Sequence, residues 1–238
     1  MERLTNLQQS KIFLRIASFV LALVTLTFSV HAVEQAKNVY HCSHTDEKVV
    51  ALTFDDGPHP RYTKEILQIL DEYGIRATFF MIGENISYYP ETAKMVVDAG
   101  HEIGNHTDTH PCIRNIGSHS IIEEMRIAEQ KIIELTGEKP ILFRPPEGLC
   151  SRSICEVAET MDYSVILWTV DTRDWAGTRA DVITRGVMKR VRGGDILLFH
   201  DYVSHKSQTV EALRQVIPAL KAQGYTFTTV SELLALEK

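Results

Sequence analysis

Two short stretches of the chain carry residue types that could bind a metal ion and move protons. T-F-D-D-G-P at residues 53–58 places two carboxylates side by side at the end of an apolar run. H-T-D-T-H at residues 106–110 spaces His106 and His110 by four positions, which would bring both imidazoles to one side of a helical turn. Two histidines and one carboxylate form a common ligand set for a divalent transition metal and leave positions open for water and substrate. The two stretches together predict a metal site.

The adjacent carboxylates of Asp55 and Asp56 repel each other. An ordinary turn would explain the Gly-Pro that follows them, but it would not explain two neighbouring negative charges. Neighbouring loop residues point in different directions. One acid can therefore ligate the metal while the other acts as general base toward a metal-bound water, whose pKa the metal lowers. A nearby arginine would favour the ionised base, and Arg144 is the candidate. The leaving group needs an acid, and His200 oriented by Asp174 suits that role.

The segments that must position these residues alternate between strand and helix character from Lys48 onward. We expect strands at residues 49–54, 77–82, 101–105, 141–143, 164–170, 195–199 and 226–229. We expect helices at residues 63–73 (with Thr63 as N-cap), 91–99, 120–135, 151–161, 180–191, 209–223 and 230–236. Such alternation implies a parallel sheet covered by helices, and this many units favours a barrel. The polar clusters follow the strands, so they would meet at one face of that barrel.

The N-terminal segment differs from the rest of the chain. Lys11 and Arg15 precede an apolar stretch from Ile16 to Val30, and V-H-A at residues 30–32 resembles a signal-peptide cleavage site. An uncleaved membrane anchor is the alternative, and either one places the working domain outside the cytoplasm. We therefore expect a signal peptide, an N-terminal extension and one catalytic domain, in that order, at residues 1–32, 33–47 and 48–238.

Composition limits the class of protein. The 238 residues are 44% hydrophobic and 24% charged, as in a soluble globular domain, and the formal net charge is −6. No basic stripe is present, so a nucleic-acid partner is not expected. The cysteines are Cys42, Cys112, Cys150 and Cys155. In an exported protein their even number is compatible with disulfides. The open alternative is that the cysteines are unpaired and act as small apolar residues.

Five blocks of sequence occur in an order that resembles the polysaccharide deacetylase family, the NodB-homology domain of carbohydrate esterase family 4. They are T-F-D-D-G-P at 53–58, H-T-D-T-H-P at 106–111, R-P-P-E-G at 144–148, D-T-R-D-W at 171–175 and L-L-F-H-D at 197–201. The resemblance implies a distorted (β/α) barrel of seven or eight strands. It also implies removal of N-acetyl or O-acetyl groups from a glycan with one divalent metal ion, Zn²⁺ first, with Co²⁺ or another divalent ion as the alternative.

The resemblance also implies a role for each matching position. Asp55 resembles the catalytic base and His200 the catalytic acid, with Arg144 and Asp174 orienting them. The family's metal ligands correspond to Asp56, His106 and His110. The substrate-binding positions correspond to Pro146, Glu147, Trp175 and Leu198, although simple barrel packing remains the alternative for Trp175 and Leu198.

One departure from the family pattern concerns the substrate groove. Where the family usually has an aromatic residue after Arg-Pro-Pro, this chain has Glu147, and Ser151 replaces a family asparagine. A backbone N–H survives any side chain, so an oxyanion contact can persist. The side chain of Glu147 could disfavour an anionic sugar, contact an amine or point to solvent. The departure affects the identity of the glycan more than the type of reaction.

We therefore expect an exported, metal-dependent deacetylase that acts on N-acetyl groups of a cell-envelope glycan such as peptidoglycan or another N-acetylhexosamine polymer. The alternatives are an acetyl-ester (xylan-type) deacetylase and a non-catalytic glycan-binding relative. We expect a monomer whose partner is the glycan, with membrane contact only if the N-terminal segment stays uncleaved.

Overall fold

A computed structural model describes residues 38–203 and 206–237 of the chain. The predicted signal peptide lies outside the described residues. Within the described ranges, no helix is both long enough and apolar enough to cross a membrane.

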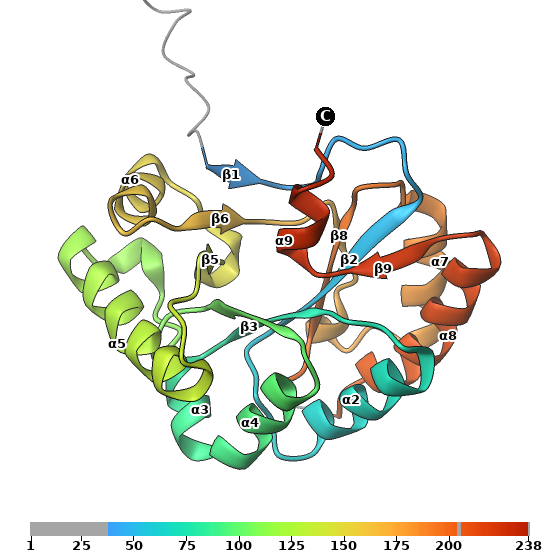
Figure 1. The fold of residues 1–238 in the computed structure, drawn as a ribbon, viewed down its shortest axis with the longest axis horizontal. Helices are drawn as coiled ribbons and strands as arrows, with labels where there is room; N and C mark the ends of the chain where they lie inside the picture. Colours follow the sequence, from blue (N-terminus) through green and yellow to red (C-terminus); the bar gives the residue numbers. More distant parts are fainter. Residues whose placement is uncertain (1–37, 204–205, 238) are drawn as a thin grey trace, which may run out of the picture. The chain divides into compact units, whose positions relative to one another are not determined.

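The centre of the domain is a parallel, curled sheet (Figure 1), as expected for a distorted (β/α) barrel. Its strands run in the order β1-β6-β5-β4-β3-β2-β8-β7, and β9 also pairs with β2. Every ladder between these strands is parallel. The strands are β1 (Val39–Tyr40), β2 (Val49–Asp55), β3 (Thr78–Met81), β4 (Glu102–Asn105), β5 (Leu142–Phe143), β6 (Ser164–Ile166), β7 (Val170–Asp171), β8 (Ile196–His200) and β9 (Thr226–Thr228).

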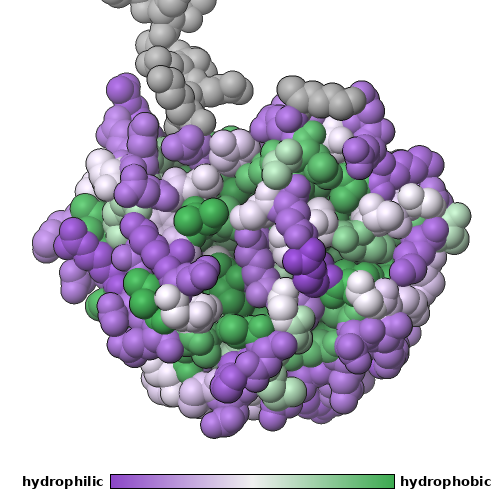
Figure 2. All heavy atoms as spheres, viewed as in Figure 1, coloured by the Kyte–Doolittle hydropathy of each residue, from purple (hydrophilic) through white to green (hydrophobic). Residues whose placement is uncertain are grey.

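Helices surround this sheet (Figure 1), and local sequence signals set several of their ends. Left-handed Gly74 and Gly137 end α2 and α5, and Pro90 begins α4. The helices are α2 (Tyr62–Tyr73), α3 (Gly83–Tyr88), α4 (Pro90–Asp98), α5 (Ser118–Thr136), α6 (Arg152–Thr160), α7 (Ala180–Arg190), α8 (Thr209–Ala222) and α9 (Val230–Leu234), with 3₁₀ turns at Ile113–Asn115, Pro146–Gly148 and Asp174–Ala176. Figure 2, viewed as Figure 1, shows hydrophilic residues around the rim of the domain and hydrophobic residues between them.

Strand β2 sorts its side chains between two hydrophobic clusters. All seven of its residues are buried, as expected for a central strand of a parallel sheet. Val50, Leu52 and Phe54 pack in the cluster that includes the apolar residues of α2 and α8. Val49 and Ala51 pack in the cluster that includes Phe80 of β3 and Ile196 of β8. Because successive side chains alternate between faces, Thr53 and Asp55 continue the face of Val49 and Ala51 to the carboxyl end of the strand.

The expected single strand over residues 164–170 is wrong, because the structure divides it into β6 and β7. Strand β6 pairs with β5 and β1, whereas β7 pairs with β8. Between them, the carbonyls of Ile166 and Leu167 accept hydrogen bonds from the Arg144 side chain at 3.0 and 3.1 Å. These two carbonyls therefore bind an arginine side chain, whereas in a continuous strand they would bind a neighbouring strand.

Three further elements differ from the expectation. Helix α3 and strand β1 were not expected, because neither carries a periodic apolar pattern of useful length. Thr63 is not an N-cap: α2 begins at Tyr62, and the Thr63 hydroxyl donates to Asp201 Oδ2 at 2.5 Å. This bond ties α2 to the residue that follows β8.

We predict opposite effects on stability for two glycine substitutions. A Cβ at Gly104 would lie 2.4 Å from the Phe80 ring, so Gly104→Ala should lower the free energy of unfolding by about 1–3 kcal/mol. Gly186, inside α7, has only the end of a flexible arginine nearby, and Gly186→Ala should raise that free energy by up to about 1 kcal/mol. Urea denaturation of both variants measures the difference. Equal effects would contradict the packing described for Phe80.

Candidate metal centre and acid–base pairs

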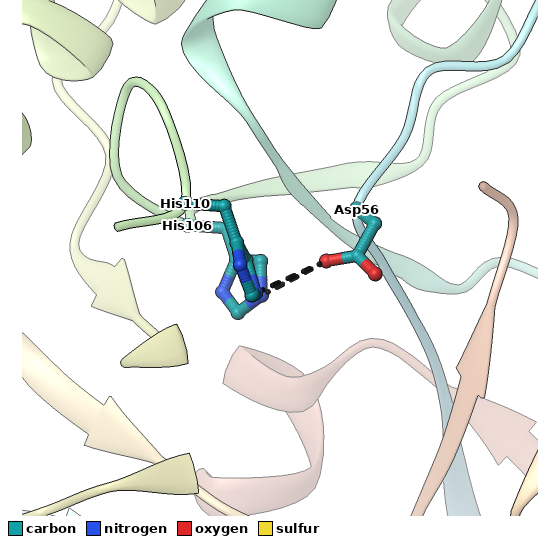
Figure 3. Close-up of side chains that lie close together, drawn as sticks. All are labelled: Asp56, His106 and His110. Atoms are coloured by element: carbon teal, nitrogen blue, oxygen red, sulfur yellow. Dashed lines mark ion pairs between the residues drawn. The ribbon is translucent and has the colours of Figure 1, made fainter. Parts of the chain in front are cut away.

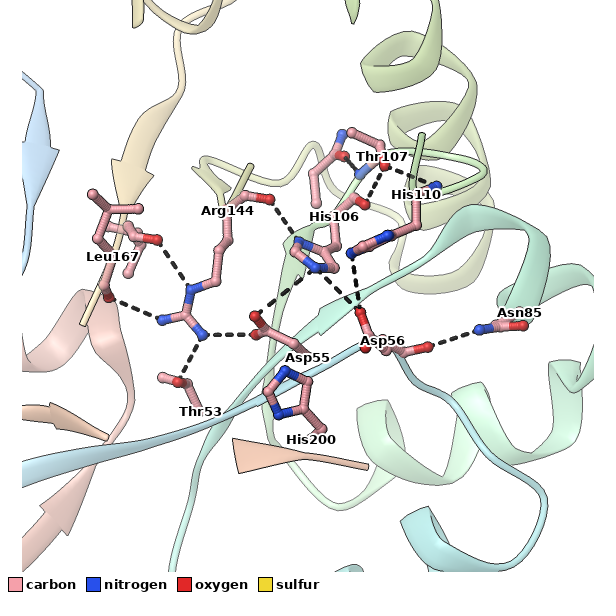
Figure 4. A network of polar contacts seen from close by, with 12 residues as sticks. Thr53, Asp55, Asp56, Asn85, His106, Thr107, His110, Arg144, Leu167 and His200 are labelled. Carbon is pink, nitrogen blue, oxygen red and sulfur yellow. Dashed lines mark hydrogen bonds and ion pairs between the residues drawn. The ribbon is translucent and has the colours of Figure 1, made fainter. Parts of the chain in front are cut away.

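The polar residues singled out in the sequence come together at the carboxyl ends of the parallel strands (Figure 4). Asp55 is the last residue of β2, and His200 is the last residue of β8. These two residues are register partners in the β2–β8 ladder. His106 directly follows β4 and Arg144 directly follows β5. Four separate strand ends therefore supply one site.

Asp56, His106 and His110 form a compact group of potential metal-ligating atoms (Figure 3). Their ligand atoms all lie within 4.8 Å of one another. The Nε2 atoms of His106 and His110 lie 3.3 and 3.5 Å from Asp56 Oδ1. That oxygen is buried and accepts no hydrogen bond. A buried, unsatisfied carboxylate oxygen facing two imidazoles fits a divalent cation, because a cation would bind all three atoms.

The charges around this group also favour a cation. Burial lowers the pKa of His106, but the Asp55 and Asp56 carboxylates outweigh burial and raise it. Burial lowers the pKa of His110, and the neighbouring His106 lowers it further. Burial raises the pKa of the Asp56 carboxyl, but the facing imidazoles, led by His106, lower it below its usual range. The site thus holds Asp56 as an anion and attracts positive charge.

The backbone and nearby side chains aim these ligand atoms. His106 Nδ1 lies 2.6 Å from the Arg144 carbonyl, which leaves Nε2 to face Asp56. Asp56 has a left-handed φ of 75°, and Asn85 Nδ2 donates to its carbonyl at 2.7 Å. The predicted helical turn at residues 106–110 is wrong: the segment is a loop in which Thr107 and His110 have left-handed φ of 68° and 53°. The two imidazoles nevertheless converge.

Arg144 and Asp55 form a buried ion pair beside this group. Arg144 is fully buried, and its Nη1 donates to Asp55 Oδ1 at 2.7 Å and to Thr53 Oγ1 at 2.8 Å. The guanidinium also lies over the Phe80 ring at 4.1 Å. Burial lowers the pKa of Arg144, while the Asp55 carboxylate acts in the opposite direction. With Oδ1 bound to the arginine, Asp55 Oδ2 faces His106 Nε2 at 3.8 Å.

His200 and Asp174 form the second pair. His200 Nδ1 lies 2.8 Å from Asp174 Oδ1, and the His200 backbone N–H donates to Asp174 Oδ2 at 2.8 Å. Thr209 donates to the same Oδ2 at 2.7 Å, so the carboxylate is held on both oxygens. Burial lowers the pKa of His200, but Asp174, with smaller contributions from Asp55 and Asp56, raises it to about 9. His200 is therefore protonated at neutral pH.

The four predicted substrate-binding residues have different surroundings. Trp175 is 48% exposed and lines a hollow of about 450 Å³ that also contains Asp56 and His110. Pro146 and Leu198 are buried and do not line it. Glu147 has a left-handed φ of 57°, and its carboxylate lies 3.7 Å from Arg114. Its charge therefore faces a cation and not solvent alone.

Sequence reasoning missed several residues that support the site. Thr53 lay inside the quoted T-F-D-D-G-P stretch, so its period-2 relation to Asp55 could have signalled its contact with Arg144. Asn85 gave no signal, because α3 was not expected. Tyr202 lines the same hollow as Trp175. The open cysteine question resolves into a Cys150–Cys155 disulfide, with Cys42 and Cys112 free.

Comparison with known proteins agrees with this geometry. A profile of the polysaccharide deacetylase family matches residues 43–166, more than half of the chain. The chain belongs to the polysaccharide deacetylase family. A peptidoglycan-N-acetylglucosamine deacetylase of Bacillus cereus is 44% identical over 191 residues, which cover 79% of this chain and 89% of that protein.

Solved structures of family members extend the match to three dimensions. The crystal structure of the Bc1960 peptidoglycan N-acetylglucosamine deacetylase superposes with a TM-score of 0.80 at 32% identity and covers 84% of this chain and 95% of that one. A family 4 acetyl xylan esterase from Clostridium thermocellum, solved with a cobalt ion, gives a TM-score of 0.73 at 33% identity and covers 79% and 91%. Family members of this fold thus include amide and ester deacetylases.

We predict that Asp174 controls the protonation of His200. In the metal-free protein, the His200 imidazole should lose its proton as the pH rises through about 9. Asp174→Asn removes the largest contribution that raises this pKa, so the titration should move down by about one unit or more. NMR titration of the imidazole measures both values. An unchanged titration in the variant would remove Asp174 from this role.

Proposed function

We propose that this deacetylase family member hydrolyses N-acetyl groups of a cell-envelope glycan with a divalent metal ion bound by Asp56, His106 and His110. The observation that supports this most directly is the placement of three groups at one set of strand ends. The three potential ligands lie beside an arginine-bound carboxylate and a carboxylate-bound imidazole. Metal-assisted hydrolysis combines a cation, a base and an acid in this proximity.

A divalent ion held by these three residues would add positive charge to the site. A bound Zn²⁺ or Co²⁺ would polarise the acetyl carbonyl and make a water molecule more acidic. The ligand set of two imidazoles and one carboxylate suits either ion and leaves coordination positions open. The acetyl group would approach through the hollow lined by Trp175, because that hollow contains Asp56 and His110.

Asp55 is the general base in this proposal. Its Oδ1 is occupied by Arg144 and its Oδ2 points toward the metal ligands, so Oδ2 is the atom that accepts a proton from the attacking water. His200 is the general acid. Asp174 outweighs burial and raises the pKa of His200, which pairs in register with Asp55 on the adjacent strand, so its proton can pass to the leaving nitrogen.

The substrate class rests on relatives and on the predicted export. The Bacillus cereus relative is a peptidoglycan-N-acetylglucosamine deacetylase, so we propose peptidoglycan or a related N-acetylhexosamine polymer as substrate. We also propose that residues 1–32 direct the chain out of the cytoplasm and that residues 48–238 act as a monomer on the envelope glycan. Arg114 lies 3.7 Å from the Glu147 carboxylate and offsets its negative charge, so this charge does not exclude an anionic sugar.

Two alternatives remain as outcomes of the test. An acetyl xylan esterase of the same fold supports hydrolysis of acetyl esters by the same groups. A non-catalytic glycan-binding protein would not need the base, the acid and three potential ligands together. We therefore place the N-acetyl deacetylase first.

The proposal predicts chelator-sensitive release of acetate. The purified protein should release acetate from peptidoglycan or from N-acetylglucosamine oligomers, lose this activity with a chelator and regain it with Zn²⁺ or Co²⁺. Acetylated xylan serves as the ester substrate in the same assay. Release from xylan alone would favour the esterase. No release from any of the three substrates, with metal bound, would favour a binding role.

We predict that Asp55→Asn separates chemistry from metal binding. The amide cannot accept a proton, so turnover should fall by about 10²–10⁴-fold. Metal content should stay near that of the parent protein, since Asp55 is not among the three proposed ligands. Acetate release and metal analysis of the same preparation measure both quantities. Asp98→Asn, on the exposed side of α4, is the matched control, and loss of metal from Asp55→Asn would contradict the proposed division of roles.

A further inference from the structure

Glu124 of α5 binds the loop that carries His110. Its Oε2 accepts the backbone N–H groups of Asp108 and Thr109 at 3.0 and 2.8 Å. Its Oε1 accepts the Thr109 hydroxyl at 2.9 Å. One carboxylate thus receives three hydrogen bonds from two consecutive loop residues, directly before His110. We propose that Glu124 is a positioning residue that holds His110 in its metal-binding orientation.

The loop needs such support because its backbone is unfavourable. Thr107 and His110 both have left-handed φ, which residues other than glycine rarely adopt. Conformations of this kind persist when surrounding contacts fix them. Threonine is β-branched, so its left-handed conformation is especially uncommon. Glu124 fixes the two residues that lie between these strained positions.

The two histidines are not held equally. His106 is buried, and its Nδ1 is bound to the Arg144 carbonyl at 2.6 Å. The His110 side chain is 33% exposed, and its backbone N–H donates to Thr107 Oγ1 at 3.2 Å. The orientation of His110 therefore depends on the conformation of its loop. Loss of the Glu124 contacts should affect His110 more than His106.

Other residues also bind this loop, but they contact its carbonyl groups and the Asp108 side chain. The backbone N–H groups of Gly83 and Glu84, at the start of α3, donate to the Thr107 and Asp108 carbonyls at 3.0 and 2.9 Å. Lys131 pairs with the Asp108 side chain at 2.6 Å. Helix α3 thus binds the loop carbonyls, whereas Glu124 binds the loop N–H groups.

This inference rests on the proposed metal site, and metal affinity tests it without any substrate. Glu124→Ala should weaken Zn²⁺ binding by about 10–100-fold, the usual effect of removing a residue that orients a metal ligand. Glu124→Gln keeps one acceptor oxygen and should lose less. Activity of Glu124→Ala should recover at high Zn²⁺, because the base and the acid are untouched.

Glu134→Ala is the matched control for a merely structural effect. Glu134 also lies on α5 and accepts a hydrogen bond, but from Gln130 of the same helix at 3.0 Å. Chelator competition gives the Zn²⁺ affinity of each variant, and urea denaturation gives the stability of each metal-free protein. We expect Glu134→Ala to keep the Zn²⁺ affinity of the parent protein.

The outcomes separate this inference from the proposed function. If the parent protein binds Zn²⁺ and Glu124→Ala binds it equally tightly, the positioning role is wrong and the proposed function stands. If Glu134→Ala loses as much affinity as Glu124→Ala, the effect is structural and the positioning role is again wrong. If the parent protein binds neither Zn²⁺ nor Co²⁺, both proposals fail together.

Discussion

The buried ion pair between Arg144 and Asp55 is the constraint on which the site depends. A guanidinium with no solvent exposure must find acceptors for its N–H groups, and here they are Asp55, Thr53 and the carbonyls of Ile166 and Leu167. Removing one partner of such a buried pair costs about 3–5 kcal/mol. The same bonds explain why β6 and β7 are separate: the backbone between them binds the arginine. The Arg144 side chain thus holds the Asp55 carboxylate in place and also separates β6 from β7.

The doubled acid after β2 follows from the alternation of side chains along that strand. Asp55 keeps the strand conformation, so its side chain continues the face of Ala51 and Thr53 and meets Arg144. Asp56 has a left-handed φ, which turns the chain out of the strand and directs its carboxylate toward His106 and His110. Two adjacent acids can therefore face different partners. A shift of one residue in the register of β2 would exchange these surroundings and leave the arginine without its carboxylate.

The sequence was sufficient for the features that depend on short-range patterns. The alternation of strands and helices predicted the fold class, and the polar residues at strand ends were found because parallel strands present their carboxyl ends at one face. The roles assigned to the site residues remain predictions. Several of the missed features depend on contacts between distant parts of the chain. Glu124 looks like its neighbour Glu123 in the sequence, and only the path of residues 107–110 makes one of them a loop anchor.

Glu147 departs from the family pattern and has a partner of its own in the structure. Glu147 replaces a stacking surface with a charge, but Arg114 lies 3.7 Å away and both side chains are more than half exposed. An exposed pair of this kind contributes only about 0–1 kcal/mol, so a substrate group can displace either partner at little cost. Trp175, at 48% exposure, is an exposed aromatic surface that lines the same hollow as Asp56 and His110. The departure at Glu147 thus leaves the Arg144–Asp55 and Asp174–His200 contacts in place.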